Sequence, residues 1–152
     1  MTQAFGATVV LHSVGDKKSL RRAATDAGIP AVTFEMGEPM RVQPEQVEHG
    51  AKAIETLMYS LGMTRQRRYW GDPEPVYYAS KWVRVNHGGI LFSDVALGER
   101  VSEGELLGVV TDPISNQQHR IYAPTSGRIL GMALNQVVLP GFAAYRIGTE
   151  TS

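Results

Sequence analysis

A carboxylate follows directly on a short apolar run in the first half of the chain. Glu35 comes after Ala31–Phe34, and Gly37 and a second acid, Glu38, lie just beyond it. A carboxylate at the end of a buried strand can act as a general base that takes a proton from water and passes it to a leaving amine. The same pattern also fits a structural carboxylate that pairs with an arginine such as Arg41, or that is simply exposed in a turn.

The elements around Glu35 favour the first interpretation. The apolar runs Ala7–Leu11 and Ala31–Phe34 predict two short strands. Helices are expected over Leu20–Ala27, with Ser19 as the N-cap and Gly28 as the stop signal, and over residues 44–61, with Pro44 in the first turn. Strand–helix–strand–helix order indicates adjacent parallel strands, and open sheets of this kind place their sites at the carboxyl ends of the strands.

The second predicted helix carries an apolar stripe that is expected to face a core. Its members recur at helical spacing: Val47, Gly50, Ala51, Ile54, Leu57, Met58 and Leu61. Two strands and two helices make a poor domain on their own, because a parallel sheet needs both faces covered. Residues 1–62 are therefore expected to be the C-terminal portion of a larger α/β domain.

Residues 63–75 break this pattern and are predicted to be a linker. Arg65, Arg67 and Arg68 are followed by Tyr69, Trp70 and two prolines. The three arginines could form a patch for phosphate or carboxylate, but a short cluster in a neutral chain also fits a solvated linker.

The remainder of the chain, residues 76–148 with a tail at 149–152, has the pattern of an all-β module. Short apolar runs alternate with Gly, Asn and Pro turns. An internal repeat is visible, because Ala96–Gly104 and Ala133–Gly141 match in Ala, Leu, Val and Gly at an offset of 37 residues. Each copy precedes an apolar strand. The repeat predicts a pseudo-symmetric β-sandwich or flattened barrel.

Part of this module resembles the barrel-sandwich fold of biotinyl and lipoyl carrier domains. The residues concerned are Gly98, Val101, Gly104 and Leu107, followed by the segment IYAPTSGRI. In those carriers a lysine on an exposed hairpin tip holds the cofactor. The corresponding tip here, Asp112–Gln118, has no lysine, so neither biotin nor lipoate is expected.

Composition limits the remaining possibilities. The 152 residues are 43% hydrophobic and 20% charged, which allows a folded core. Basic and acidic residues balance at 15 each, so neither nucleic acid nor an anionic membrane is an expected partner. The chain has no cysteine and no signal-like or membrane-spanning start, and a cytoplasmic location is expected.

Taken in order, several segments resemble the C-terminal part of the succinylglutamate desuccinylase/aspartoacylase family, whose members resemble zinc carboxypeptidases. These segments are GIPAVTFEMGEP, GGILF, LGERVSEGELLGVVTDP and APTSGRILGMALNQVVLPG. The resemblance implies that Glu35 is the catalytic acid/base in the hydrolysis of an N-acyl amino acid or a related amide. It also implies a zinc ion that activates the attacking water.

The metal ligands of that family are not found in this sequence. The family binds zinc through His-x-x-Glu and a later histidine, and none of His12, His49, His87 and His119 begins such a motif. His12 ends an apolar strand but lies only 23 residues before Glu35, so it is an unlikely third ligand. No metal ligand is therefore assigned in this chain.

The expected fold is a partial parallel α/β sheet followed by a barrel-sandwich-hybrid β module. The expected function is that of a C-terminal fragment of a zinc-dependent amidohydrolase or deacylase, inactive alone, with Arg41 and the Asp112–Gln118 loop as candidates to contact an N-acyl amino acid substrate. The alternative is a non-enzymatic binding or oligomerisation module. Either way, self-association or an upstream partner segment is expected to cover the sheet edge and face that the missing strands would leave open.

Overall fold

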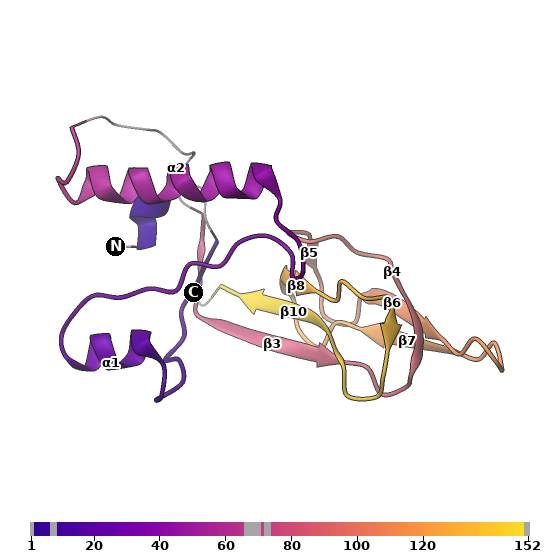
Figure 1. Cartoon of the computed structure of the whole chain (residues 1–152). Coiled ribbons are helices and arrows are strands. Elements are labelled where there is room, and N and C mark those ends of the chain that lie inside the picture. The colour runs from indigo at the N-terminus through magenta and orange to yellow at the C-terminus, as the bar shows by residue number, and fades with distance from the viewer. Residues whose placement is uncertain (1, 7–8, 66–70, 72–73, 151–152) are drawn as a thin grey trace. The chain divides into compact units, whose positions relative to one another are not determined.

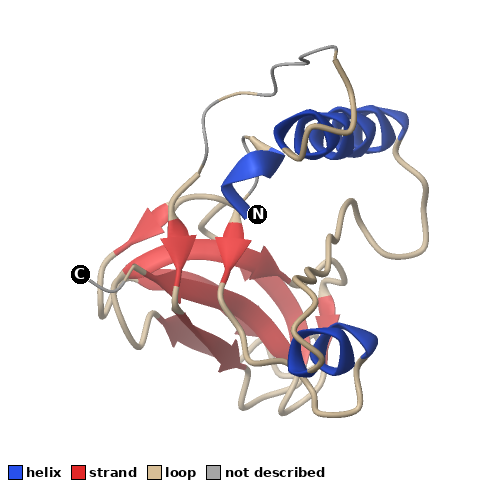
Figure 2. Ribbon diagram, turned by 90° about the vertical axis from the view of Figure 1, so that its left-hand side faces the viewer, coloured by secondary structure: helices blue, strands red, loops and turns tan. Residues whose placement is uncertain are grey.

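The protein is described by a computed structural model that covers residues 2–6, 9–65, 71 and 74–150. The chain divides into two compact units, Met1–Val76 and Tyr77–Ser152. All helices of the described residues belong to the first unit, and most strands belong to the second (Figures 1 and 2). Most of the segment predicted to be a linker, including Arg67, Arg68, Tyr69 and Trp70, lies outside the described residues.

The first unit contains a 3-10 helix, η1 (Thr2–Phe5), a two-residue strand, β1 (Val10–Leu11), and two helices, α1 (Leu20–Asp26) and α2 (Pro44–Ser60). Both predicted helices are confirmed, each ending one residue earlier than expected. The hydroxyl of Ser19 accepts a hydrogen bond from the backbone N–H of Arg22 at 3.2 Å, which satisfies one of the free donors at the start of α1. Gly28 follows α1 with a φ of +76°, a conformation that glycine adopts without a steric penalty.

The predicted strand at Ala31–Phe34 is wrong. These residues are not assigned to a strand, and β1 pairs instead with β2 (Val76–Tyr77). Among the described residues there is thus no parallel pair formed by Val10–Leu11 and Ala31–Phe34. A run of β-formers can favour an extended backbone, but a strand also needs a neighbour that accepts and donates its hydrogen bonds.

The apolar stripe of α2 is covered on only one side. Gly50 and Ala53 are buried, and α2 packs against η1. By contrast, Val47, Ile54 and Leu61 are each about half exposed, at 53%, 47% and 53%. The prediction that the whole stripe faces a core is therefore wrong for this half of it.

The second unit consists of two four-stranded antiparallel sheets. One sheet has the order β3-β10-β8-β5, and the other has the order β7-β6-β4-β9. The strands are β3 (Ala79–Arg84), β4 (Gly89–Ser93), β5 (Arg100–Val101), β6 (Leu106–Thr111), β7 (Gln118–Tyr122), β8 (Gly127–Met132), β9 (Val137–Val138) and β10 (Ala143–Thr149).

This topology reproduces the sequence repeat. The offset of 37 residues carries β5 onto β9 and β6 onto β10, and it brings β4 and β3 close to the ranges of β8 and β7. Under this exchange the order β3-β10-β8-β5 becomes β7-β6-β4-β9, which is the other sheet. Each sheet therefore contains strands from both copies of the repeat, and the predicted pseudo-symmetry is confirmed.

One hydrophobic core holds the two sheets together, and each of the eight strands contributes to it. Its largest fully buried members are Tyr145, Leu107, Ile129 and Ile147. Tyr145 of β10 reaches across this core, because its hydroxyl donates a hydrogen bond to the backbone carbonyl of Leu107 in β6 at 2.9 Å. Within the described residues, no helix is long and apolar enough to cross a membrane.

Candidate functional site

Glu35 lies in a segment without regular secondary structure, and its two neighbours pack on the helices of the first unit. The ring of Phe34 packs on Phe5 with 5.3 Å between ring centroids, and the Met36 side chain lies directly over Gly50. Residues 34 and 36 therefore both pack on the helices of this unit, whereas the side chain of Glu35 is exposed.

The turn after Glu35 is stabilised by a side chain from the start of α2. Gly37 has a φ of +75°, and Gln43 Oε1 accepts a hydrogen bond from the backbone N–H of Glu38 at 3.0 Å. The Gln43 oxygen occupies the space above Gly37, where a Cβ atom would lie only 3.2 Å from it. The turn is therefore built for glycine, and it begins two residues beyond the candidate base.

Arg41 does not pair with Glu35. Its Nε atom lies 2.7 Å from Glu38 Oε2, and both side chains are partly exposed. Within the described part of the chain, no hydrogen bond or ion pair occupies the carboxylate of Glu35. The arginine pairing proposed for a structural carboxylate thus belongs to the second acid, and Glu35 is left exposed in solvent.

The two histidines of the first unit, His12 and His49, lie on separate elements. His12 follows β1, and His49 lies within α2. Among the described residues, no group of three or more His, Asp or Glu side chains could hold a metal ion. In the described part of the chain, neither Glu35 nor a histidine belongs to a group of side chains that could bind a metal ion.

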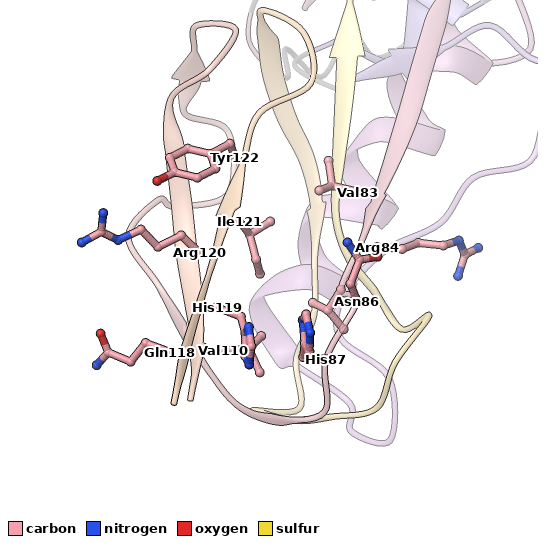
Figure 3. A pocket seen from close by; sticks show the side chains of 11 residues that line it. Val83, Arg84, Asn86, His87, Val110, Gln118, His119, Arg120, Ile121 and Tyr122 are labelled. Atoms are coloured by element: carbon pink, nitrogen blue, oxygen red, sulfur yellow. The ribbon is translucent and has the colours of Figure 1, made fainter. Parts of the chain in front are cut away.

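The other two histidines form a pair that the sequence does not reveal. The rings of His87, in the bend after β3, and His119, in β7, stack with centroids 3.5 Å apart and planes 5° from parallel. The pair lines a cavity of about 690 Å³ in the second unit (Figure 3). The place of His119 directly after the Asp112–Gln118 tip favours a turn position, but the residue lies in β7 instead. The only signal for this pair is the equivalence of β3 and β7 in the repeat, which makes both of them edge strands.

The loop Asp112–Gln118 connects β6 and β7, as the resemblance to carrier domains implied. Backbone N–H groups of Ile114 and Ser115 donate to Asp112 Oδ1 at 2.8 and 3.3 Å. These hydrogen bonds, the one from Ile114 above all, lower the pKa of the Asp112 carboxyl below its usual range. The acid therefore organises the tip itself, and the tip exposes the side chain of Ile114.

Comparison with known proteins finds similarity at the level of structure alone. No family model matches the sequence, and no curated protein matches it either. Among solved structures, a succinylglutamate desuccinylase from a Silicibacter species superimposes with a TM-score of 0.82 at 22% identity, covering 96% of this chain and 46% of that one.

Two further solved structures agree with this match. The apo form of the ectoine utilization protein EutE (DoeB) from Ruegeria pomeroyi gives a TM-score of 0.86 at 16% identity, over 96% of this chain and 48% of its own. A succinylglutamate desuccinylase/aspartoacylase from Rhodobacter sphaeroides gives 0.81 at 18%, over 99% and 48%. The chain thus has the fold of succinylglutamate desuccinylase/aspartoacylase structures over about half the length of their chains.

Proposed function

We propose that this chain is the C-terminal portion of a zinc-dependent amidohydrolase, a deacylase that cleaves N-acyl amino acids or related amides. One observation carries the proposal. The chain superimposes over nearly its whole length on structures named as succinylglutamate desuccinylases, with TM-scores of 0.81 and 0.82, and spans about half of theirs. The order of the family-like segments in the sequence supports the same assignment and favours the C-terminal half.

Glu35 is the residue proposed to move the proton. An exposed carboxylate can accept a proton from an attacking water and donate it to the departing amine, and this kind of catalysis contributes roughly 10² to 10⁴ in rate. The packing of Phe34 and Met36 against the helices supports the role, because it holds the backbone on both sides of Glu35 and leaves the carboxylate exposed. In this proposal Arg41 binds a carboxylate of the substrate, which would require it to leave Glu38.

The described residues of this chain do not fit a zinc site. A catalytic zinc ion takes three protein ligands and keeps one open position, and the described residues offer no such group. The proposal therefore requires that the ligands come from another segment of polypeptide, and His12 is not assigned as one of them. The chain alone is expected to be inactive, and a cytoplasmic location is proposed from the lack of cysteine.

The test is hydrolysis of N-succinylglutamate with and without the segment encoded just upstream, which is to be searched for a His-x-x-Glu motif. The chain alone with added zinc is expected to show no hydrolysis, and the extended protein to be active. Glu35→Gln in the extended protein is expected to lower kcat at least about 100-fold, whereas Glu38→Gln, three residues further on, is expected to keep most of the activity. Full activity of Glu35→Gln would exclude Glu35 as the acid/base, and hydrolysis by the chain alone would show that the ligands are present.

The alternative is a non-enzymatic binding or oligomerisation module. The exposed half of the α2 stripe, at Val47, Ile54 and Leu61, favours it, because contiguous apolar surface of this kind is usually covered. Sedimentation velocity at micromolar protein concentration shows whether the chain self-associates or stays a monomer that needs a different partner to cover this surface. A monomer that stays soluble and stable on dilution would count against both self-association and a missing partner segment.

A further inference from the structure

The cavity between β3 and β7 lies in the second unit, away from the segment that carries Glu35 in sequence. Its volume is about 690 Å³, and Figure 3 shows the two imidazoles facing each other between the two strands. The side chains of Val83, Val110 and Ile121 line it beside the histidines. His87 is exposed and His119 is partly buried, so a ligand can reach both rings from solvent.

The chemistry of the lining is one-sided. Nitrogen donors are plentiful, and no carboxylate is present among the residues that line the cavity, which are Val83, Arg84, Val85, Asn86, His87, Val110, Gln118, His119, Arg120, Ile121 and Tyr122. Imidazole, guanidinium and amide groups all offer N–H donors, and protonated imidazole and guanidinium also carry positive charge. A ligand that accepts hydrogen bonds and carries negative charge suits such a lining.

The charged side chains nearest the imidazoles, those of Arg84, Arg120 and Asp112, are directed elsewhere or already hydrogen-bonded. The guanidinium of Arg84 donates to the carbonyl of Gly141 at 2.8 Å, and Figure 3 shows Arg84 and Arg120 pointing away from the stacked rings. Both therefore add positive potential without touching a ligand at the ring edges. Asp112 interacts electrostatically with His119, but its Oδ1 atom already accepts the backbone hydrogen bonds of the loop tip.

Because the two rings lie so close together, the charge on the histidines and the binding of an anion are expected to influence each other. Two imidazoles at 3.5 Å can stack while at least one is neutral, but two positive rings at that separation repel each other. An anion that accepts an N–H from each ring offsets this repulsion with two charge-assisted hydrogen bonds. Anion binding and proton uptake would then favour each other, and imidazole is the side chain that gains its proton in mildly acidic solution.

We propose that the cavity binds a small oxyanion, of the carboxylate or phosphate class, at the edges of His87 and His119, and that the bound anion brings a proton with it. The site is independent of the proposed hydrolytic function, because it uses only residues of the β unit. The chain alone is sufficient to test it.

Calorimetric titration of the chain with sodium succinate and, separately, with sodium sulfate as a stand-in for phosphate tests the site. Chloride keeps the ionic strength constant. Saturable binding with a stoichiometry of one is expected at pH 6.0, and binding at least about tenfold weaker is expected at pH 8.0, since one linked proton changes affinity up to tenfold per pH unit. Binding of succinate alone assigns the carboxylate class, and binding of sulfate alone assigns the phosphate class.

His119→Gln and His87→Gln are each expected to weaken binding at pH 6.0 at least tenfold, and His49→Gln on α2 is the matched control that should leave it unchanged. Imidazole proton NMR signals of the unmodified chain provide a readout that does not depend on folding of a variant: those of His87 and His119 should move on titration, and those of His49 should not. No saturable binding at pH 6.0, equal affinity at both pH values, or unchanged signals of both stacked histidines would overturn the proposal.

Discussion

Removal of one hydroxyl group tests how the two β sheets are joined. Tyr145 is fully buried, and its hydroxyl lies 2.9 Å from the Leu107 carbonyl and 3.2 Å from Ser93 Oγ, both on the opposite sheet. Gly108 makes room for it, because a Cβ atom there would collide with the tyrosine oxygen. Tyr145→Phe keeps the ring and deletes this contact between the sheets.

The expected cost is modest because the abandoned acceptor keeps a second partner. The Leu107 carbonyl also accepts the backbone N–H of Asp94 at 2.9 Å, so it is not left unsatisfied. The net contribution of one hydrogen bond is about 1 kcal/mol, and we expect Tyr145→Phe to lower the free energy of unfolding by that amount. For a unit of the size of Tyr77–Ser152, the loss corresponds to a decrease in Tm of roughly 4–8 °C.

The same variant changes the response to alkaline pH. Burial raises the pKa of the Tyr145 hydroxyl, with Ser93 opposing the shift through its hydrogen bond. A raised pKa in the folded state means that the unfolded state releases its proton first, at about pH 10. Stability from the buried neutral hydroxyl is thus present below about pH 10 and is lost as the pH rises towards the folded-state pKa. Tyr145→Phe has no hydroxyl to ionise, so its stability does not fall for this reason.

Thermal unfolding followed by circular dichroism at pH 7.5 and at pH 10.5 measures both effects, with Tyr122→Phe as the control at a half-exposed tyrosine. At pH 7.5 only Tyr145→Phe should lower Tm appreciably. At pH 10.5 the difference between the unmodified chain and Tyr145→Phe should shrink. Equal Tm values for the two variants at pH 7.5, or a constant difference at both pH values, would refute this account of the hydroxyl.

Three further changes test local features. Gly50→Ala displaces only the flexible end of the Met36 side chain, and alanine favours the helix by about 1 kcal/mol over glycine; the urea midpoint should therefore stay or rise, and a clear decrease would show that Met36 cannot shift from its place over the helix. Ser19→Ala removes the cap of α1 and should cost about 1 kcal/mol of helix stability, seen as a smaller helical circular dichroism signal, whereas Ser60→Ala at the end of α2 should not reproduce it. Asp112 has a lowered pKa in the folded state, so its contribution to the loop tip should be present at neutral pH and lost as the pH falls towards its pKa; amide NMR signals of the tip should shift there in the unmodified chain and not in Asp112→Asn.

The β unit could be predicted from the sequence because its information is local and repeated. Each copy brings its own turn glycine, core valine and following strand, as Gly104 with Val101 and Gly141 with Val138 illustrate. A single copy would leave the strand order open. Two copies at a constant offset are expected to occupy equivalent places in the fold. The two sheets meet this expectation, because each contains strands from both copies in the same order.

The site was harder to predict because it depends on contacts between distant residues. The sequence does not decide which acid Arg41 pairs with, because Glu38 lies three residues before it and Glu35 six, and both are within reach of an arginine in a turn. The stack of His87 on His119 depends on how the two edge strands lie in space, and single-residue patterns carry no information about that. The composition of Ala31–Phe34 indicates an extended backbone but contains no information about whether a neighbouring strand exists.

The two units differ in how much of their apolar surface is buried, and this difference bears on the proposed function. The β unit buries a residue from each strand in one core, whereas the described part of the first unit buries the hydrophobic side chains of only Phe5 and Ala53. The first unit nevertheless holds Glu35 through Phe34, Met36 and the surface of α2. A base that must be placed to within a fraction of an ångström needs a rigid support. Whatever covers the exposed half of α2 should therefore raise the rigidity of the Glu35 segment as well, and hydrogen exchange at residues 34–36 is the direct measure of that coupling.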